Sequence, residues 1–329
     1  MRYQFKFRPY QRRFLRSLTT NHGRWDIREG IILRLTDETL KVGWGEIAPI
    51  SWFGSETLEQ ALDFCRQLPG EITDETIFSI PDELPACQFG FESAQEWESE
   101  FFSIPNAPCP MPNAQFFSAL LPSGEAALNQ WETLWQRGYR TFKWKIGVNA
   151  IANELKIFES LIHTLPASTK LRLDANGGLT YEEANLWLWT CDNLKANPEI
   201  PLEIEFIEQP LPVEQFQQML ELSKSYETAI AIDESVATLG QLAACYQQGW
   251  RGIFVIKPGI VGSPSRLRKF CHQHQVDTVF SSVFETAIAR LAALKLAAEL
   301  SQNNRAIGFG IDHFFEQEET WFQTLWNDL

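Results

Sequence analysis

Long apolar runs are missing from this sequence. No stretch of about 18 consecutive apolar residues occurs, so we expect no membrane-spanning helix. The N-terminus is basic, but charged residues interrupt it throughout, and it contains neither a continuous apolar segment nor a cleavage site, which argues against a signal peptide. These absences predict a cytoplasmic protein without a membrane partner.

Patterns for binding metals through cysteine or histidine are also missing. The six cysteines lie far apart without a C-x-x-C pair, and only five histidines are present. His272 and His274 are two positions apart on a predicted helix, so their side chains do not share a face. We therefore expect reduced thiols, and neither a zinc site nor a disulfide framework.

Positive charge is scarce, since the formal net charge is −14. This argues against general binding to nucleic acid or to an anionic membrane, because both require a basic face. An anionic ligand would need local cations to overcome the repulsive global field. The motifs G-x-G-x-x-G and G-x-x-x-x-G-K-[ST] follow none of the predicted strands, so the usual nucleotide-binding folds lack support as well.

The composition is that of an ordinary globular protein. With 329 residues, 44% hydrophobic and 21% charged, the chain is long enough for a large α/β domain with a smaller partner. Residues 1–105 alternate short apolar runs with turns, which predicts a small antiparallel sheet, and helical patterns cover residues 55–68 and 85–102. The proline-rich segment 103–113 is the best candidate linker.

After the linker, short apolar strands alternate with amphipathic helices. The predicted strands cover residues 115–121, 141–146, 170–176, 203–210, 229–235, 252–259, 277–285 and 306–310, and the helices between them include 124–138, 180–194, 213–226, 238–249 and 286–301. About eight strands with intervening helices predict a parallel sheet, which closes naturally into a barrel. An open, doubly wound sheet is the alternative.

The predicted strand at residues 141–146 carries two lysines on an otherwise apolar segment. Successive side chains of a strand alternate between faces, so Lys143 and Lys145 point one way while Phe142 and Trp144 point the other way. The simplest alternative is an exposed strand face whose ammonium groups lie in water.

Polar residues recur at the same end of successive predicted strands. They are Lys145, Asp174, Glu208, Asp233 and Lys257, followed by the pair Ser281 and Ser282. Up to Ser281, successive members are 24 to 34 residues apart, the length of one strand plus one helix. Catalytic groups of a β/α barrel project from the C-terminal ends of its strands toward one mouth, so this phase predicts a ring-shaped site.

Three acids, Asp174, Glu208 and Asp233, would meet on adjacent strands, where like charges raise one another's pKa. A divalent hard cation resolves this conflict, and a set of carboxylates suits Mg²⁺ or Mn²⁺ rather than zinc. Taken singly, each acid has an alternative as a surface carboxylate, and Asp233 or its neighbour Glu234 as a helix cap.

The lysines complete a possible catalytic set. Lys143 and Lys145 would flank the metal, and Lys257 would face them across the barrel. Neighbouring cations lower a lysine pKa toward the range in which it acts as a base at neutral pH. The arrangement suits proton abstraction next to a carboxylate, with Mg²⁺ stabilising an enediolate.

Seven stretches make the chain resemble the enolase superfamily, in its muconate-lactonising subgroup. They are KVGWGEIAP, FKWKIG, LRLDAN, FIEQP, IAIDES, VIKPGIVGS and SSVFET, in that order over about residues 40–286. Within the subgroup the chain most resembles the o-succinylbenzoate synthase family. The resemblance implies a (β/α)7β-type modified TIM barrel at residues 106–309, with an α+β capping domain at residues 1–105 that is completed by about residues 310–329.

The resemblance also implies catalytic roles. Mg²⁺, or Mn²⁺ in its place, would be ligated by Asp174, Glu208 and Asp233. Lys145 would remove the proton α to the substrate carboxylate and then protonate the departing hydroxide, in a syn elimination of water. Lys143 would lower the pKa of Lys145 and hold the substrate carboxylate, and Lys257 would stabilise the enediolate from the opposite face of the ring. A structural partner of a ligand carboxylate is the alternative for Lys143.

Further residues are implied around this set. Asn176 and Glu234 would orient metal ligands, and Ser281 and Ser282 would contact the substrate. Trp25, on a predicted loop, would help to cap the barrel mouth over the succinyl arm of the substrate. The alternatives are a surface aromatic for Trp25 and a cap of the next helix for the serines. The tryptophans near the C-terminus, Trp321 and Trp326, would pack the tail against the N-terminal sheet.

The implied function is a Mg²⁺-dependent lyase of quinone biosynthesis that acts on a small anionic carboxylate. A racemase of N-acylamino acids or a dipeptide epimerase is the first alternative, since these relatives share the same lysines and acids. A non-catalytic barrel that binds small anions is a more remote one. The sequence leaves the oligomeric state open.

Overall fold

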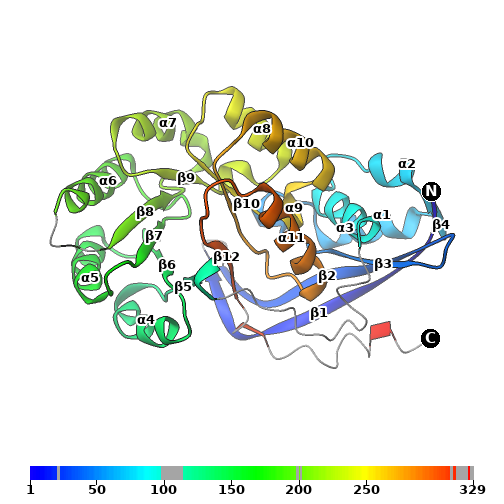
Figure 1. Ribbon diagram of the computed structural model, residues 1–329, viewed down its shortest axis with the longest axis horizontal. Helices are drawn as coiled ribbons and strands as arrows, with labels where there is room; N and C mark the ends of the chain where they lie inside the picture. The colour runs from blue at the N-terminus through cyan, green and yellow to red at the C-terminus, as the bar shows by residue number, and fades with distance from the viewer. Residues whose placement is uncertain are drawn as a thin grey trace.

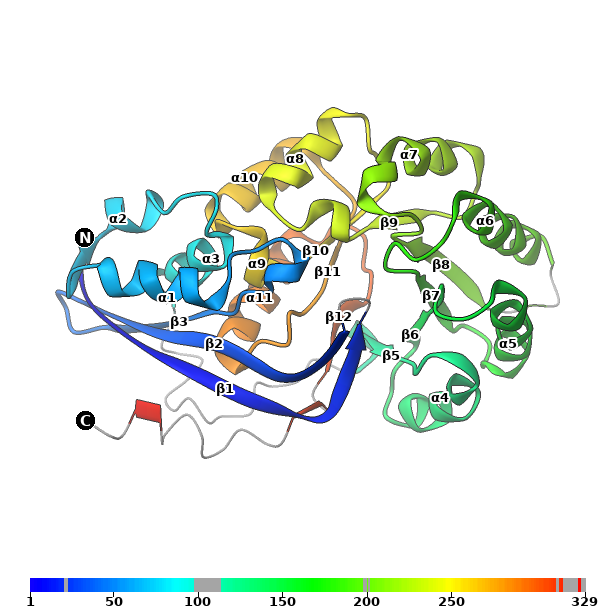
Figure 2. The same cartoon turned by 180° about the vertical axis from the view of Figure 1, so that it is seen from behind.

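The N-terminal part of the protein is built on a four-stranded antiparallel sheet with the order β3-β2-β1-β4 (Figure 1). The computed structural model describes residues 1–20, 23–97, 114–197, 200, 202–311, 314–315 and 325–326. The strands are β1 (Arg2–Thr20), β2 (Gly23–Asp37), β3 (Val42–Ile47) and β4 (Glu71–Thr73). β1 and β2 form a long hairpin that extends from the N-terminal helices to the barrel (Figure 2).

Three helices lie against this sheet: α1 (Leu58–Gln67), α2 (Asp74–Phe78) and α3 (Pro85–Gln95). A capping box formed by Thr57 and Gln60 starts α1. α3 packs closely on β3, where a Cβ added at Gly45 would lie 2.0 Å from the carbonyl oxygen of Gly90. The predicted antiparallel sheet and the helix within 55–68 are confirmed, and the helix predicted at 85–102 ends earlier, at Gln95.

The second part is an eight-stranded parallel sheet with the order β11-β10-β9-β8-β7-β6-β5-β12. Its strands are β5 (Phe117–Leu120), β6 (Thr141–Lys145), β7 (Lys170–Asp174), β8 (Glu203–Glu208), β9 (Ile230–Ile232), β10 (Ile253–Ile256), β11 (Thr278–Phe280) and β12 (Ile307–Gly310). A parallel bridge between Ser281 and Gly308 joins the two outer strands. The sheet therefore closes into a barrel, and the open-sheet alternative is wrong.

Helices follow the first seven of these strands, and most of them cover the barrel from outside, whereas the short helix at Pro258–Val261 lies against α3 (Figures 1 and 2). They are α4 (Ala127–Gln136), α5 (Ile151–Thr164), α6 (Tyr181–Lys195), α7 (Phe216–Ser225), α8 (Leu239–Gln247), α9 (Pro258–Val261), α10 (Pro264–His274) and α11 (Ala287–Leu300). The five helices expected in this part are confirmed, and α5, α9 and α10 are additional. The (β/α)7β architecture is confirmed.

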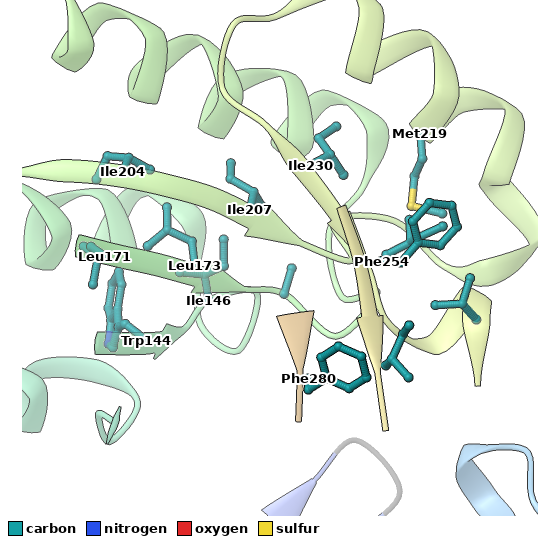
Figure 3. Close-up of a cluster of buried hydrophobic side chains, with 14 of the residues drawn as sticks. Trp144, Ile146, Leu171, Leu173, Ile204, Ile207, Met219, Ile230, Phe254 and Phe280 are labelled. Atoms are coloured by element: carbon teal, nitrogen blue, oxygen red, sulfur yellow. The ribbon is translucent and has the colours of Figure 1, made fainter. Parts of the chain in front are cut away.

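The main core lies between the strands of the barrel and these helices. Figure 3 shows Trp144, Ile146, Leu171 and Leu173 among its side chains, all of them fully buried. Phe142 and Trp144 of β6 face this core, whereas Lys143 and Lys145 alternate to the other face and are half-buried. The predicted split of β6 into an apolar face and a lysine face is thus confirmed.

Several expectations concern the periphery of the fold. In the part of the chain that the structure describes, we find no helix that could span a bilayer. The described cysteines, Cys65, Cys87, Cys191, Cys245 and Cys271, are free thiols in buried positions. The linker at 103–113, together with Cys109 and Trp321, lies outside the described residues.

The end of the chain meets the N-terminal sheet at Trp326. Its ring lies 4.9 Å from that of Trp44 on β3, and the guanidinium groups of Arg8 and Arg34 lie 5.5 and 5.4 Å from its centroid. These contacts support the expectation that the tail completes the capping domain. The domain boundaries themselves remain predictions.

Candidate active site

The charged residues predicted at the strand ends lie side by side at the C-terminal edge of the barrel. Lys145, Asp174 and Glu208 are the last residues of β6, β7 and β8, and the strand register pairs Lys145 with Asp174 and Asp174 with Glu208. Asp233 and Lys257 directly follow β9 and β10. Parallel strands present their ends at one mouth, so the structure brings the five together.

Lys143 lies deeper on the same face of β6 and bridges two of the acids. Its Nζ is 2.8 Å from Asp174 Oδ2 and donates to Glu208 Oε1 at 2.7 Å. Burial opposes its charge, but the surrounding carboxylates outweigh this and raise the pKa of Lys143. The carboxylate contacts of Lys143 therefore fit the alternative of a partner to ligand carboxylates, and its proposed role toward Lys145 stays a prediction.

Lys257 has two partners on opposite parts of the molecule. Its ammonium pairs with Asp233 of the barrel and lies 4.0 Å from the ring centroid of Phe53, in the 3-10 turn Ser51–Phe53 of the N-terminal part. Asp233 makes no capping hydrogen bond to the turn that follows it, so the helix-cap alternative is wrong for Asp233. Phe53 was missed in the sequence, where nothing marks it as a neighbour of Lys257.

The acids of the mouth are held in an environment that disfavours their charge. Burial raises the pKa of Glu208 to about 8, and burial likewise raises the pKa of Asp233 and of Glu234. Glu234 receives a hydrogen bond from Asn176 Nδ2 at 3.0 Å, and its other carboxylate oxygen is buried without a hydrogen-bond partner. The cluster has more buried carboxylate oxygen than the described lysines neutralise.

Gln209 organises the ends of β8 and β9. Its side-chain oxygen accepts from the backbone N–H of Asp233 at 3.0 Å, and its amide donates to Ser235 Oγ at 2.8 Å. Its backbone adopts a φ of 39°, a left-handed value that turns the chain sharply after Glu208. The sequence stretch FIEQP contains Gln209, but the repeat of polar residues at strand ends predicted only Glu208 as a site residue.

The donor set fits a hard divalent cation. Among the described residues, no group of three or more histidine, cysteine or acidic side chains has already converged on one point. Instead, Lys143 pairs with Asp174 and Glu208, and Lys257 pairs with Asp233. Three neighbouring buried carboxylates and the partnerless oxygen of Glu234 are compatible with such a cation, which prefers carboxylate oxygen.

The two serines are placed by the strand that precedes them. Ser281 N donates to Ile256 O at 2.8 Å, next to Lys257. Ser282 Oγ donates to Glu285 Oε2 at 2.8 Å and accepts from Phe284 N at 2.9 Å. The N-cap of α11 is Thr286, so the alternative that the serines cap this helix is wrong.

Trp25 is a residue of strand β2, and the predicted loop around it is wrong because the β1–β2 hairpin continues almost to its tip. Its ring lies 5.7 Å from Phe284, which follows β11, and 5.8 Å from Trp52. A cavity of about 360 Å³ lies beside it, lined also by Arg28 and Trp52. Trp25 thus belongs to an aromatic cluster between the hairpin and the barrel rather than being a solitary surface aromatic.

Two family models match the chain, one for each part. The model described as "Enolase C-terminal domain-like" matches residues 126–325, and the model described as "MenC, N-terminal domain" matches residues 6–97. The chain is 43% identical to an o-succinylbenzoate synthase of Thermosynechococcus vestitus, over 99% of both chains.

Solved structures agree with these matches. A crystal structure of o-succinylbenzoate synthase from Thermosynechococcus elongatus BP-1, complexed with Mg in the active site, is similar with a TM-score of 0.85 and 40% identity, covering 99% of this chain and 100% of that one. The L-Ala-D/L-Glu epimerase of Bacillus subtilis is similar with a TM-score of 0.75 at 21% identity, covering 96% of this chain and 91% of that one. At that identity the second likeness concerns the fold alone.

Proposed function

The chain belongs to the enolase superfamily, and on that premise we propose that it catalyses the o-succinylbenzoate synthase reaction. This reaction is a syn dehydration of 2-succinyl-6-hydroxy-2,4-cyclohexadiene-1-carboxylate to o-succinylbenzoate, a carbon–oxygen lyase step of menaquinone or phylloquinone biosynthesis. The observation that carries the proposal is the 43% identity over 99% of both chains, together with a MenC-type N-terminal domain.

The proposed metal is Mg²⁺, with Mn²⁺ suited to the same oxygens. Asp174, Glu208 and Asp233 would hold it, because they are the neighbouring buried acids of the mouth. When bound, the ion supplies positive charge that stabilises the negative charge developing on the substrate carboxylate. Lys143 would then orient Asp174 and Glu208, and its ammonium would also face the substrate carboxylate.

Lys145 is the proposed base. As a neutral amine it takes the proton from the carbon α to the carboxylate, so the C–H bond breaks and its electron pair moves into the ring. The C–O bond to the hydroxyl group then breaks, and the new ammonium of Lys145 returns the proton to the departing hydroxide, which leaves as water. One residue on one face thus accounts for a syn elimination.

Lys257 is proposed to stabilise the charge from the other side of the ring. Asp233 and the ring of Phe53 hold its ammonium in place. The proposed supporting roles are orientation of metal ligands for Asn176 and Glu234, contact with the substrate for Ser281 and Ser282, and shielding of the succinyl arm from water for Trp25.

The test is a steady-state assay of the purified protein with the cyclohexadiene carboxylate, after removal of metal by EDTA and again after addition of Mg²⁺. We expect o-succinylbenzoate to form only in the presence of the metal. Absence of turnover in the Mg²⁺-loaded protein would contradict the proposal. Exchange of solvent deuterium into the α position of an N-acylamino acid or a dipeptide would then identify the racemase or epimerase alternative.

A further inference from the structure

Glu46 is a buried carboxylate that joins the capping domain to the barrel. It lies on β3 and has no exposed surface. Its carboxylate accepts from Thr286 N at 3.0 Å, from Thr286 Oγ1 at 2.5 Å and from Ala289 N at 3.2 Å, all in the first turn of α11. A carboxylate at the N-terminus of a helix is stabilised by the free N–H groups and by the helix dipole.

A second strand of the cap completes this arrangement. Tyr10 of β1 donates its hydroxyl to Glu46 Oε1 at 2.5 Å. A Cβ added at Gly30 would lie 2.6 Å from the Tyr10 ring, so the absence of a side chain there permits Tyr10 to cross β2 and reach the carboxylate. Burial raises the pKa of Tyr10, which keeps it a neutral donor. Two cap strands therefore converge on one helix of the barrel.

The helix turn that Glu46 binds ends a segment of the barrel mouth, residues 281–286, which we call the mouth loop. At its start, Ser281 is fixed to β10 and to Gly308 by backbone hydrogen bonding. In its middle, Phe284 adopts a φ of 61°, a left-handed value that is costly for a bulky residue and persists only where the surroundings impose it. The ring of Phe284 contacts Trp25 and Phe14 of the hairpin.

We propose that Glu46 is a positioning residue, which holds the mouth loop in its strained conformation and fixes it against the cap. The loop is anchored by the barrel sheet at one end and by Glu46 at the other, and it carries Ser281, Ser282 and Phe284 between these anchors. Loss of the Glu46 anchor releases the loop and separates the serines from the aromatic cluster around Trp25. This inference rests on the proposed function for its kinetic readout.

The test compares Glu46→Gln with Glu92→Gln as a matched control. Glu92 is also a cap carboxylate, only 3% exposed, and it accepts from Ser265 N at 2.9 Å in the first turn of α10. It therefore has the same chemistry at the same interface between the two parts, but it binds a different helix. Both changes replace a carboxylate by an amide that presents an N–H group to existing donors, so both should lower Tm.

We expect kcat/KM of Glu46→Gln to fall by about 10-fold or more, because small displacements of substrate-contacting groups are costly. The increase in KM should exceed the decrease in kcat, since the loop contacts substrate and does not transfer the proton. Amide hydrogen exchange of residues 281–289, which needs no activity, should become faster. Glu92→Gln should keep kcat/KM within about 2-fold of wild type.

A second pair of variants covers the case in which Glu46→Gln does not fold. Thr286→Val removes the hydroxyl donor to Glu46, and Thr286→Ser keeps it. We expect Thr286→Val to show a smaller version of the Glu46→Gln effect and Thr286→Ser to retain wild-type kinetics. Equal kcat/KM in these two variants, or a Glu46→Gln protein that loses Tm while its kcat/KM and exchange at 281–289 match wild type, overturns the inference. An inactive wild-type protein instead contradicts the proposed function, and hydrogen exchange still decides the role of Glu46.

Discussion

The barrel buries ionisable groups at both ends of its strands, but the two ends differ in how fully the buried carboxylates are paired with cations. At the N-terminal end of the strands, Glu205 lies 2.6 Å from Arg172 and 2.9 Å from Arg305, which also contacts Asp277 at 2.8 Å. Burial opposes the charge of Glu205, but the two arginines outweigh it and lower its pKa. Here each carboxylate has its cations, which fits a role in stability.

At the mouth the same chemistry is left unbalanced. The pKa of Glu208 is raised to about 8 by burial, and Glu234 retains a buried oxygen without a partner. The ion pairs of Lys143 and Lys257 do not supply enough positive charge to balance the acids of the mouth. Buried charge that is left without counter-charge therefore indicates a functional site, whereas buried charge that is paired indicates a role in stability.

The largest effect that separates the two ends is expected for Lys145→Ala. We expect kcat to fall by about 10²- to 10⁴-fold, the usual contribution of a general base. Tm should stay close to wild type, because the ion pairs of the mouth are made by Lys143 and Lys257. Steady-state kinetics and thermal unfolding check this, and wild-type turnover in the variant would remove Lys145 from the mechanism.

Glu205→Gln is expected to lower the stability of the protein while leaving kcat unchanged. Its loss leaves Arg172 buried without its carboxylate, which should cost about 3–5 kcal/mol of unfolding free energy. The kcat measured well below the unfolding transition should match wild type, because the cluster lies at the far end of the strands.

The matched control for this change is Glu203→Gln on the same strand. Glu203 pairs with Lys170 at 3.3 Å, and both side chains are largely exposed. Such a pair contributes at most about 1 kcal/mol. Equal destabilisation by the two variants in urea unfolding would show that the buried network has no special weight.

A third prediction concerns acid. The folded pKa values of Glu205 and Asp277 are lowered, from usual values of 4.5 and 3.8. Their contribution to stability is therefore complete above those usual values and is lost as pH falls through the lower folded values. Urea unfolding of metal-free protein should show a steeper loss of stability at acid pH in wild type than in Glu205→Gln. Parallel pH profiles would contradict this assignment.

The smallest effect is expected for the stability of metal-free Glu208→Gln. Removing this acid relieves repulsion among the carboxylates, while Lys143 keeps Asp174 at 2.8 Å. The unfolding free energy should stay within about 1 kcal/mol of wild type or rise. Added Mg²⁺ should raise the Tm of wild type but not that of the variant. A loss as large as that of Glu205→Gln would erase the contrast between the two ends.

The strand-end residues of the site were predictable from the sequence because the signals are local. Alternation along β6 separated Lys143 and Lys145 from the apolar face, and the repeat of strand and helix put Asp174 and Glu208 in phase. Trp25 was misplaced in a loop because glycine, asparagine and threonine around it are typical of turns, whereas long-range pairing extends the hairpin through it.

Contacts between the two parts of the chain carried no comparable signal. Phe53 reaches Lys257, and Glu46 reaches Thr286, which is 240 positions away. No sequence motif or periodicity connects either residue with its partner. Such pairs depend on how the cap docks on the barrel.

From the sequence alone came the alternation of strands and helices after the linker and the charged residues that end the strands, because both follow from patterns that are local along the chain. The pairing of charged side chains depends on the tertiary structure. Lys143 forms ion pairs with Asp174 and Glu208, Lys257 with Asp233, and Arg172 with Glu205. The physical reason is that burial and distance set the strength of an ion pair and the direction of a pKa shift, and both are properties of the folded chain.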